Sequence, residues 1–476
     1  MFPKHLDPST HSAQRRQFLF RSALGLGGIA YGDLALRANG ISAANETTSL
    51  APRPSLPTAT AKQVIFLFMQ GGPSHLETFD PKPAMRKYDG KLLPSSLRDF
   101  DLAQINTADA PVMAPIFPFQ KCGHSGIEIS SLFPELKRHA DKLTVLRSVH
   151  HDLFIHGSAL TMMHSGTRLL GHPSVGSWVV YGLGSESDSL PAYVAMSDTF
   201  FRNGAATYAS GFLPAVFQGT YLRTQGAPIQ NLRRPNGLAP SEQEMVLNQL
   251  ARWNARHRNE RPGDSRLDAR LANYELAFRM QTAAPDLIDL SQETQTTQEL
   301  YGIGGKTTDN FGKMCLLSRR MVERGVRYIH LVDGDWDAHG DCRGNHQGRA
   351  QCVDKPIAGL LQDLAQRGLL EETLVVWGGE FGRTPIMQGS NGRDHHPYGF
   401  SMWMAGGGVT GGQTIGATDD FGFSAIEDRV HVNDLHATML SLLGLQHQEL
   451  TFLFEGRERR LTDVGGQNDL SARLTT

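Results

Sequence analysis

The sequence predicts an α/β fold in which helices cover a mostly parallel sheet, and two patterns indicate it. Residues 64–69 are apolar without alternation and run into the glycines of "QGGPS", which is typical of a strand buried on both faces of a parallel sheet. Residues 326–380 show a strand pattern, a helix pattern and a second strand pattern, and this spacing implies a right-handed parallel crossover. Further strands are expected at 143–149 and 191–198.

The main domain is predicted over 63–465, followed by a short tail at 466–476. Within it, residues 200–300 show helical spacing with many Arg and Gln, and we expect a mostly helical insertion that shapes a substrate cleft. An amphipathic helix is expected after it over 310–325. A second helix is expected over 353–368, with Pro356 in its first turn, where proline is tolerated.

Composition is that of a globular protein, and length permits one large α/β domain or two or three smaller ones. Of the 476 residues, 40% are hydrophobic, 8% aromatic and 20% charged. The net charge of −2 gives no electrostatic reason to expect a nucleic acid or an acidic membrane surface as partner. The 19 histidines gather near 150–172, 330–346, 395–396 and 431–447, which directs attention to these segments.

Residues 1–44 are predicted to be a twin-arginine signal peptide. Arg15 and Arg16 precede a mild Gly/Ala/Leu run, and "ISAAN" supplies small residues for cleavage near Ala44. A short N-terminal membrane anchor is the alternative interpretation. No later segment reaches the roughly 18 unbroken apolar residues of a spanning helix. We therefore expect a soluble periplasmic or extracellular protein that begins near residue 45, with a Pro/Thr/Ser-rich linker over 45–62.

Four cysteines are present, and an oxidising compartment would permit disulfides. Cys342 and Cys352 are the only pair close in sequence. They could form a disulfide or remain two free thiols. A cysteine-based zinc site is not expected, because no CxxC pair exists.

The stretch "DGDWDAHG" at 333–340 is a candidate metal-binding loop. It follows a predicted strand of the parallel sheet, and ligands of such sheets bind beyond the carboxyl ends of the strands. Aspartate and histidine together suit a divalent ion, and the loop offers Asp333, Asp335, Asp337 and His339. The alternative is a solvated turn, because Asp and Gly are ordinary turn residues.

Two further segments bring residues of the same type to the predicted edge. "GRDHHP" supplies Asp394, His395 and His396 shortly after Glu380, which ends another predicted strand. These residues favour metal binding over hydrogen-bonded loop histidines.

Ser158 lies near the start of a predicted helix, where it could act as a nucleophile, hold an oxyanion or simply cap the helix. Arg383 could hold an anion or pair with a carboxylate.

Five segments occur in the order seen in the alkaline phosphatase–sulfatase superfamily: "VIFLFMQGG", "HGSALTMMHSGT", "VDGDWDAH", "VVWGGEFGRTP" and "HVNDLHATMLSLLGL". More closely, "FMQGGPSHLETFDPKP", "EFGRTP" and "TDDFGF" resemble a large domain-of-unknown-function family of twin-arginine-exported bacterial proteins, usually placed in that superfamily. The resemblance covers roughly residues 15–465. It implies an alkaline phosphatase-like three-layer sandwich, with helices on both faces of a mostly parallel sheet.

The resemblance also implies a phosphate or sulfate ester hydrolase with a Ser, Thr or formylglycine nucleophile on one or two metal ions. His156 occupies the expected nucleophile position, with Ser158 two residues later. There it could ligate metal or accept a phosphoryl group. Gln70 replaces an aspartate ligand, and Glu380-Phe381 replaces an Asp-His pair, so the second metal site is expected to be eroded.

One metal site is expected to be retained. The resemblance matches Asp335 and His339 to a DxxxH metal pair, with Asp337 as the alternative carboxylate, and assigns the late ligand to His395 or His396. The metal expected is Zn²⁺ or Mn²⁺, with Mg²⁺ or Ca²⁺ as alternatives.

Together these features predict an exported, metal-dependent hydrolase of small-molecule or polysaccharide phosphate or sulfate esters. Glu380 or His156 would serve as general base, and Ser158 and Arg383 would steady the leaving oxyanion. The alternative is a non-catalytic metal- or glycan-binding relative of the same fold, favoured by the altered nucleophile position. The sequence indicates no oligomeric state.

Overall fold

A computed structural model describes residues 50–95, 109–223, 237–260, 265–463 and 465–476. The predicted signal peptide over 1–44 lies outside the described residues, as does the start of the linker. No helix in the described part combines the length and apolar character that crossing a membrane requires.

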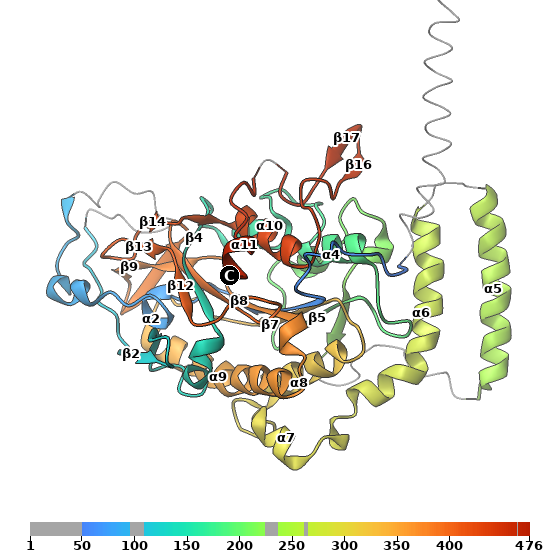
Figure 1. The fold of residues 1–476 in the computed structure, drawn as a ribbon, viewed down its shortest axis with the longest axis horizontal. Helices are drawn as coiled ribbons and strands as arrows, with labels where there is room; N and C mark the ends of the chain where they lie inside the picture. Colours follow the sequence, from blue (N-terminus) through green and yellow to red (C-terminus); the bar gives the residue numbers. More distant parts are fainter. Residues whose placement is uncertain (1–49, 96–108, 224–236, 261–264, 464) are drawn as a thin grey trace, which may run out of the picture.

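A mixed sheet forms the centre of the molecule, as Figure 1 shows. In the described chain it has nine strands, in the order β12-β4-β11-β8-β1-β7-β5-β6, with β15 also paired to β4. These strands are β1 Gln63–Met69, β4 Thr144–His150, β5 Tyr193–Ser197, β6 Thr220–Arg223, β7 Tyr328–Asp333, β8 Thr373–Gly378, β11 Phe400–Ala405, β12 Gln413–Ile415 and β15 Val430–His431.

Helices cover both faces of the sheet. On one face lie α8 Asp309–Val322 and α9 Cys342–Gln366; on the other lie α3 His156–Ser165, α4 Val175–Leu183 and α10 Val432–Leu442. Strand β1 is buried along its whole length because its side chains alternate between the two layers. Ile65 and Leu67 join the core with α8 and α9, and Phe66 and Phe68 join the core with α4 and α10.

The sheet is mixed rather than purely parallel because of one strand. β11 runs antiparallel to both of its neighbours, β8 and β4, whereas the other pairings in this sheet are parallel. Between β8 and β11 the chain forms a hairpin, β9 Gly382–Gln388 and β10 Gly392–His396. Because this hairpin does not cross to the other edge of the sheet, the chain re-enters in the opposite direction.

Smaller elements complete the fold. The helices are α2 His75–Thr78, α7 Gln295–Leu300 and α11 Ser471–Leu474. The strands form three short hairpins: β2 Phe119–Cys122 with β3 Ile127–Ser130, β13 Ala417–Thr418 with β14 Ala425–Glu427, and β16 Phe452–Phe454 with β17 Arg457–Arg459.

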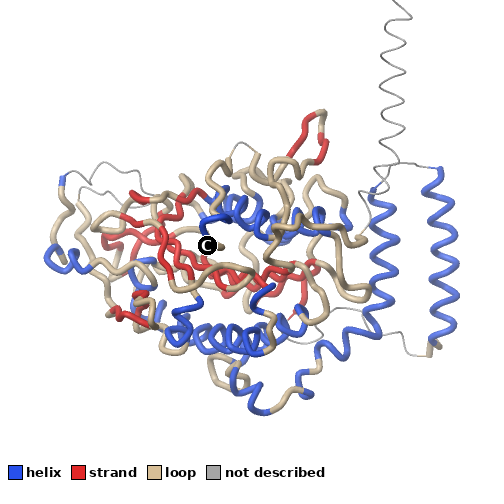
Figure 2. Tube along the Cα trace, in the orientation of Figure 1, coloured by secondary structure: helices blue, strands red, loops and turns tan. Residues whose placement is uncertain are grey.

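The segment where a helical insertion was predicted contains two long helices and one strand of the sheet. The helices are α5 Pro240–Glu260 and α6 Ser265–Ile288, which stand side by side at one end of the molecule in Figure 2. The strand is β6, which pairs with β5. The helical part of the segment therefore begins after the edge of the sheet.

Helix α9 differs from the prediction over 353–368 because it begins at Cys342. Asp341 caps the helix by accepting a hydrogen bond from the Gly344 N–H, so the helix starts directly after the loop that carries His339. Pro356 therefore lies in the interior of the helix rather than in its first turn. Cys342 and Cys352 lie ten residues apart on this helix, a rise of about 15 Å, which no disulfide can bridge. Both thiols are free, so the disulfide alternative is wrong.

Candidate metal centre

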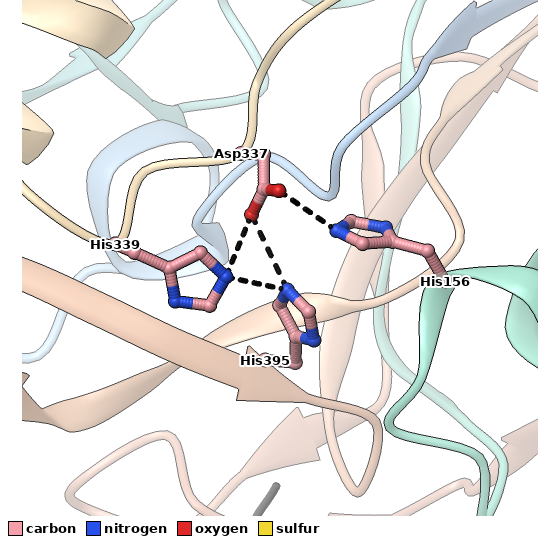
Figure 3. Close-up of side chains that lie close together, drawn as sticks. All are labelled: His156, Asp337, His339 and His395. Carbon is pink, nitrogen blue, oxygen red and sulfur yellow. Dashed lines mark hydrogen bonds and ion pairs between the residues drawn. The ribbon is translucent and has the colours of Figure 1, made fainter. Parts of the chain in front are cut away.

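Four predicted site residues converge at one edge of the sheet: His156, Asp337, His339 and His395 (Figure 3). Their nearest ligand atoms all lie within 4.8 Å of one another. His156 begins α3, Asp337 and His339 lie in the loop between β7 and α9, and His395 lies on β10. Strands β1, β7 and β8 end in register beside this point, as the parallel arrangement requires.

The Asp337 carboxylate lies at the centre of the cluster. Its Oδ1 is 3.0 Å from Nε2 of His339 and 3.2 Å from Nε2 of His395, and its Oδ2 is 3.0 Å from Nε2 of His156. The Nε2 atoms of His339 and His395 are themselves only 2.9 Å apart. Three imidazoles thus present the same ring nitrogen to one carboxylate.

The other nitrogen of each imidazole faces an oxygen. His156 Nδ1 lies 2.6 Å from Glu380 Oε1, His395 Nδ1 lies 2.8 Å from the Phe154 carbonyl, and His339 Nδ1 contacts the Gln388 side-chain oxygen. These oxygens only accept, so each Nδ1 carries a proton and each ring directs its Nε2 atom toward the cluster. An oxygen that accepts from the ring nitrogen facing away from the ion orients a metal-binding histidine.

The pKa values follow from this arrangement. For Asp337, burial favours the neutral acid, but hydrogen bonds from the three histidines and a nearby arginine outweigh it and hold its pKa far below the usual range. For His156, burial favours the neutral ring, but Asp337 and Glu380 outweigh it and raise its pKa. Asp337 chiefly raises the pKa of His339, whereas burial lowers that of His395. Asp337 is therefore ionised, and the histidines gather around its charge.

The loop that carries Asp337 is held by close backbone contacts. Trp336 donates its backbone N–H to the Gln70 carbonyl at 3.0 Å. Gly71 and Gly392 lie against the loop with no room for a side chain: a Cβ at Gly71 would meet the Asp337 nitrogen at 2.6 Å, and one at Gly392 would meet the His339 carbonyl oxygen at 2.0 Å. Glycine at these positions lets the loop approach both β1 and β10.

Arg383 lies in the wall of the site and holds this loop. Its Nη2 is 2.7 Å from Asp337 Oδ1, and its other nitrogens donate to the carbonyls of Gly72 at 2.9 Å and Arg393 at 3.2 Å. The side chain is fully buried. This placement does not suit the predicted role of steadying a leaving oxyanion, because its donors are already used by the protein.

Arg202, which the sequence interpretation missed, is a more open cation at the site. Its Nη1 is 3.1 Å from Asp337 Oδ2 and its Nη2 is 3.3 Å from Asp335, and its side chain is 22% exposed. Gln70 holds the Arg202 segment by donating to the Phe200 carbonyl at 3.0 Å and accepting from the Arg202 N–H at 2.9 Å. The signal available in the sequence was position, because Arg202 follows β5 at the same edge of the sheet.

The structure does not bring Asp333 or Asp335 into the cluster. Asp333 is fully buried, accepts from Trp336 Nε1 at 2.8 Å and pairs with Arg349, so it serves the packing of the strand end. Asp335 has a positive φ of 77°, and its side chain is 74% exposed and turned to Arg202. Of the two alternative carboxylates, Asp337 is the one that meets His339.

The late histidine in the cluster is His395 and not His396. Successive side chains of a strand point to opposite sides, so the His396 ring turns away and bonds to the Phe423 carbonyl. Asp394 lies beside the cluster: its Oδ1 accepts from the His395 N–H at 2.8 Å and is 3.9 Å from His339 Nδ1.

Ser158 and Glu380 are placed differently from their predicted catalytic roles. The Ser158 hydroxyl donates to the Ile155 carbonyl at 3.0 Å and contacts none of the four cluster residues. Glu380 is fully buried behind His156, and both its carboxylate oxygens accept from the Gly71 N–H. A fully buried carboxylate in that position is placed to orient His156.

Fold and cluster together define an α/β protein with a candidate His₃Asp metal centre at the carboxyl ends of its parallel strands. The chain belongs to the family described as "Protein of unknown function (DUF1501)", whose model matches residues 61–471. No curated protein matches the chain.

Solved structures with a similar fold include three bacterial proteins. The PsFucS1 sulfatase from Pseudoalteromonas sp. is 13% identical, and the match covers 81% of this chain and 68% of that one with a TM-score of 0.33. The lipoteichoic acid synthase LtaP from Listeria monocytogenes is 11% identical, with 85% of this chain and 78% of that one covered and a TM-score of 0.35. The alkaline phosphatase from the Antarctic bacterium TAB5 is 10% identical, with 81% of this chain and 99% of that one covered and a TM-score of 0.32. At these TM-scores the similarity supports no conclusion about the site or its chemistry.

Proposed function

We propose that the protein is a metal-dependent hydrolase of phosphate or sulfate esters, built on one divalent ion. The observation that carries the proposal is the 2.9 Å approach of His339 Nε2 to His395 Nε2 beside the Asp337 carboxylate. When both rings are neutral with the proton on Nδ1, the two Nε2 atoms turn lone pairs toward each other and toward a negative oxygen. A proton or a metal ion between them makes that arrangement favourable, and a metal ion would satisfy His156 and Asp337 at the same point.

The donor set fits a transition-metal ion. His156 Nε2 is buried and makes no hydrogen bond of good geometry, although Asp337 lies 3.0 Å away. Three imidazoles and one carboxylate suit Zn²⁺ or Mn²⁺ better than Mg²⁺ or Ca²⁺, which prefer oxygen ligands. His156, Asp337, His339 and His395 would hold the ion. His156 then serves as a ligand, and a covalent phosphoryl-histidine is not part of the proposal.

The ion would supply Lewis-acid polarisation of the ester oxygen. The remaining work falls to the protein. Arg202, the partly exposed guanidinium at the rim, would bind the anionic oxygens of the phosphate or sulfate group. Glu380, Gln388 and the Phe154 carbonyl would fix the three imidazoles, so that the ligand atoms need no reorganisation when substrate binds.

Water is the proposed attacking group, because the hydroxyl of Ser158, two residues after His156, donates to the Ile155 carbonyl instead of to the cluster. The water oxygen forms a bond to phosphorus or sulfur, the bond to the ester oxygen breaks, and the leaving alkoxide takes up the proton that water loses. The products are an alcohol and inorganic phosphate or sulfate. The alcohol is proposed to belong to a small molecule or a polysaccharide.

The second candidate is a metal-dependent binding protein without turnover. The observation that favours it is Gln70, which stands where the resemblance implies a metal-binding aspartate and holds the segment that brings Arg202 onto Asp337. Such a site would retain phosphate or sulfate groups without cleaving the ester.

Metal content is the first test, measured by elemental mass spectrometry on protein purified without chelator or affinity tag. We expect about one equivalent of Zn²⁺ or Mn²⁺ per chain, lost in His339→Ala and kept in His124→Ala, whose imidazole is exposed on the surface. A chain without metal would contradict both candidates, and two equivalents would contradict the one-ion centre.

Turnover separates the two candidates. Metal-loaded protein is assayed with nitrophenyl phosphate, nitrophenyl sulfate and sulfated oligosaccharides, before and after metal removal and replacement. Metal-dependent release of product supports the hydrolase. Saturable binding of the same esters by metal-loaded protein, without product, favours the binding protein.

Export by the twin-arginine pathway is part of the proposal, since that pathway carries folded, cofactor-loaded proteins. Replacing Arg15 and Arg16 by lysine should hold the protein in the cytoplasm with its precursor uncleaved. Fractionation of cells that express the two forms tests this, and an unchanged periplasmic or extracellular fraction would contradict it.

A further inference from the structure

Helix α5 presents a face that the described structure leaves uncovered. Its inner side faces α6, and Leu247, Leu250 and Ala251 line a cavity between the two helices together with Tyr274 and Phe278. Figure 1 shows α6 between α5 and the rest of the molecule, so that the other side of α5 faces outward.

The outward side carries large apolar residues. Trp253 is 61% exposed, Met245 63% and Val246 52%. Single exposed apolar residues are ordinary, but these three share one side of one helix, because they lie seven or eight residues apart or directly adjacent. An exposed apolar patch on a helix face is typical of an interaction surface.

The charges on this side are arranged in two halves. Glu242 lies in the first turn of α5, and Arg252 and Arg256 lie in the second half, with Glu260 at the end of the helix; all four are exposed. A helix side with an acid near its start and two arginines in its second half is complementary to a copy of itself in the antiparallel direction. It is not complementary to a parallel copy, nor to a surface of one charge.

From these observations we propose that α5 is the interface with a second copy of this chain, packed antiparallel about a two-fold axis at Gln249. About that axis Glu242 faces Arg256 of the second copy, and Met245 faces Trp253 of the second copy. Gln249 faces itself. Each apolar pair and each ion pair occurs twice, as an isologous interface requires.

Contacts within the subunit are compatible with this pairing. Arg256 Nε lies 3.5 Å from Glu260, but the two side chains are 84% and 62% exposed, so the pair adds little and Arg256 can turn to another carboxylate. Glu242 accepts the Ala239 N–H at 2.8 Å, which holds its carboxylate at the outer start of the helix. Equal charges stay apart, since the two copies of Glu242 are separated by 14 residues of helix rise, about 21 Å.

The expected dimer is of moderate strength. A seam of one 21-residue helix per subunit, backed by α6, lies at the small end of specific interfaces. We therefore expect a dissociation constant in the micromolar range, with α5 and α6 of both copies forming a four-helix arrangement. The proposal does not depend on the function of the metal centre, which lies on other elements.

Cysteine cross-linking tests the axis. In the full chain Gln249→Cys should form a disulfide-linked dimer under mild oxidation, because position 249 faces itself across the axis. Glu242→Cys is the matched control on the same exposed side, and it should remain monomeric on a non-reducing gel. Equal cross-linking of the two variants, or none at 249, would overturn the proposal.

Charge exchange tests the pairing. Sedimentation velocity at micromolar to high micromolar concentration should show a monomer–dimer equilibrium for the wild type, and Arg256→Glu should weaken it roughly tenfold or more by placing Glu against Glu. Combining Glu242→Arg with Arg256→Glu should restore the dimer. A monomeric wild type, a dimer insensitive to Arg256→Glu, or an exchange that fails to restore it would each overturn the antiparallel arrangement.

Discussion

His330 in the middle of β7 should make the protein lose stability as the pH falls. Its ring stacks on Phe66 with centroids 5.4 Å apart and lies 4.8 Å from the ring of His164. Both ring nitrogens are buried, and neither has a hydrogen-bond partner among the described residues. Burial lowers the pKa of His330 to about 3. We therefore expect His330→Leu to reduce the dependence of stability on pH.

The magnitude follows from the difference between the folded and unfolded pKa values. Below about pH 6.5 the unfolded chain binds a proton at this imidazole that the folded chain does not, so acid favours unfolding. Each pH unit between the two pKa values removes about 1.4 kcal/mol. The fall from about pH 6.5 to about pH 4 thus removes roughly 3 kcal/mol of the free energy of unfolding at His330. Above about pH 6.5 both states are neutral and the contribution is constant.

Urea unfolding of the wild type and of His330→Leu, at neutral pH and at about pH 4, measures this difference. A chelator is present throughout, so that metal release contributes to neither protein. Leucine has a similar volume and no nitrogen to desolvate, so we expect little change at neutral pH and a relative gain in acid. His124→Leu removes an exposed imidazole and is the control. If wild type and His330→Leu lose the same stability in acid, the reasoning is refuted.

Three further substitutions probe the metal centre. Glu380→Gln keeps the shape behind His156 but removes the negative charge beside its Nδ1. Metal affinity, measured by competition with a chelator, should therefore fall roughly 10- to 100-fold. Unchanged affinity would contradict the orienting role of Glu380. Arg202→Ala should leave metal content unchanged and weaken binding of inorganic phosphate roughly 10- to 100-fold by calorimetry, whereas loss of the metal would show that Arg202 serves the centre itself. Gly392→Ala should displace the His339 carbonyl and cost about 1–3 kcal/mol in unfolding together with the metal, while a fully loaded variant would refute the steric argument.

The strands could be predicted because burial on both faces leaves a direct mark in the sequence. Residues 64–69 are apolar without alternation, and the structure confirms them as β1 at the centre of the sheet. The strands at 143–149, 191–198 and 373–380 are confirmed as β4, β5 and β8 with small shifts at their ends. Direction is harder to predict, because the antiparallel entry of β11 depends on the β9–β10 hairpin before it.

Helix α9 shows where local patterns are insufficient. Pro356 suggested a helix start, because proline is best tolerated in the first turn. Its cost inside α9 is offset by tertiary packing, in which Val353, Ile357 and Leu360 fill the core beneath the sheet. Closeness in the sequence is therefore a poor guide here: it led to a helix start that is too late and to a disulfide that the helix does not permit.

At the candidate site, the sequence predicted which segments come together but not which of their side chains form the cluster. Asp335 and Asp337 are both aspartates of one glycine-rich loop, and only the turn of the backbone at Asp335 (φ 77°) decides which carboxylate faces the histidines. His395 and His396 alternate across β10, so one residue of register separates a cluster member from a packing residue. Arg202 comes from a segment with no recognisable motif and depends on Gln70 to reach Asp337.

Gln70 and Phe381 argue for one ion rather than two. The resemblance implies a metal-binding aspartate where Gln70 stands and a histidine ligand of the second metal where Phe381 stands. Phe381 instead packs its ring on His156 and His395, with centroids 5.0 and 4.5 Å away, and offers no ligand atom. The Gln70 side-chain amide makes hydrogen bonds to the segment that carries Arg202, and the Arg202 guanidinium lies beside Asp337 Oδ2. Neither side chain therefore supplies the ligand that a second ion would need, and the described residues offer one cluster for one ion.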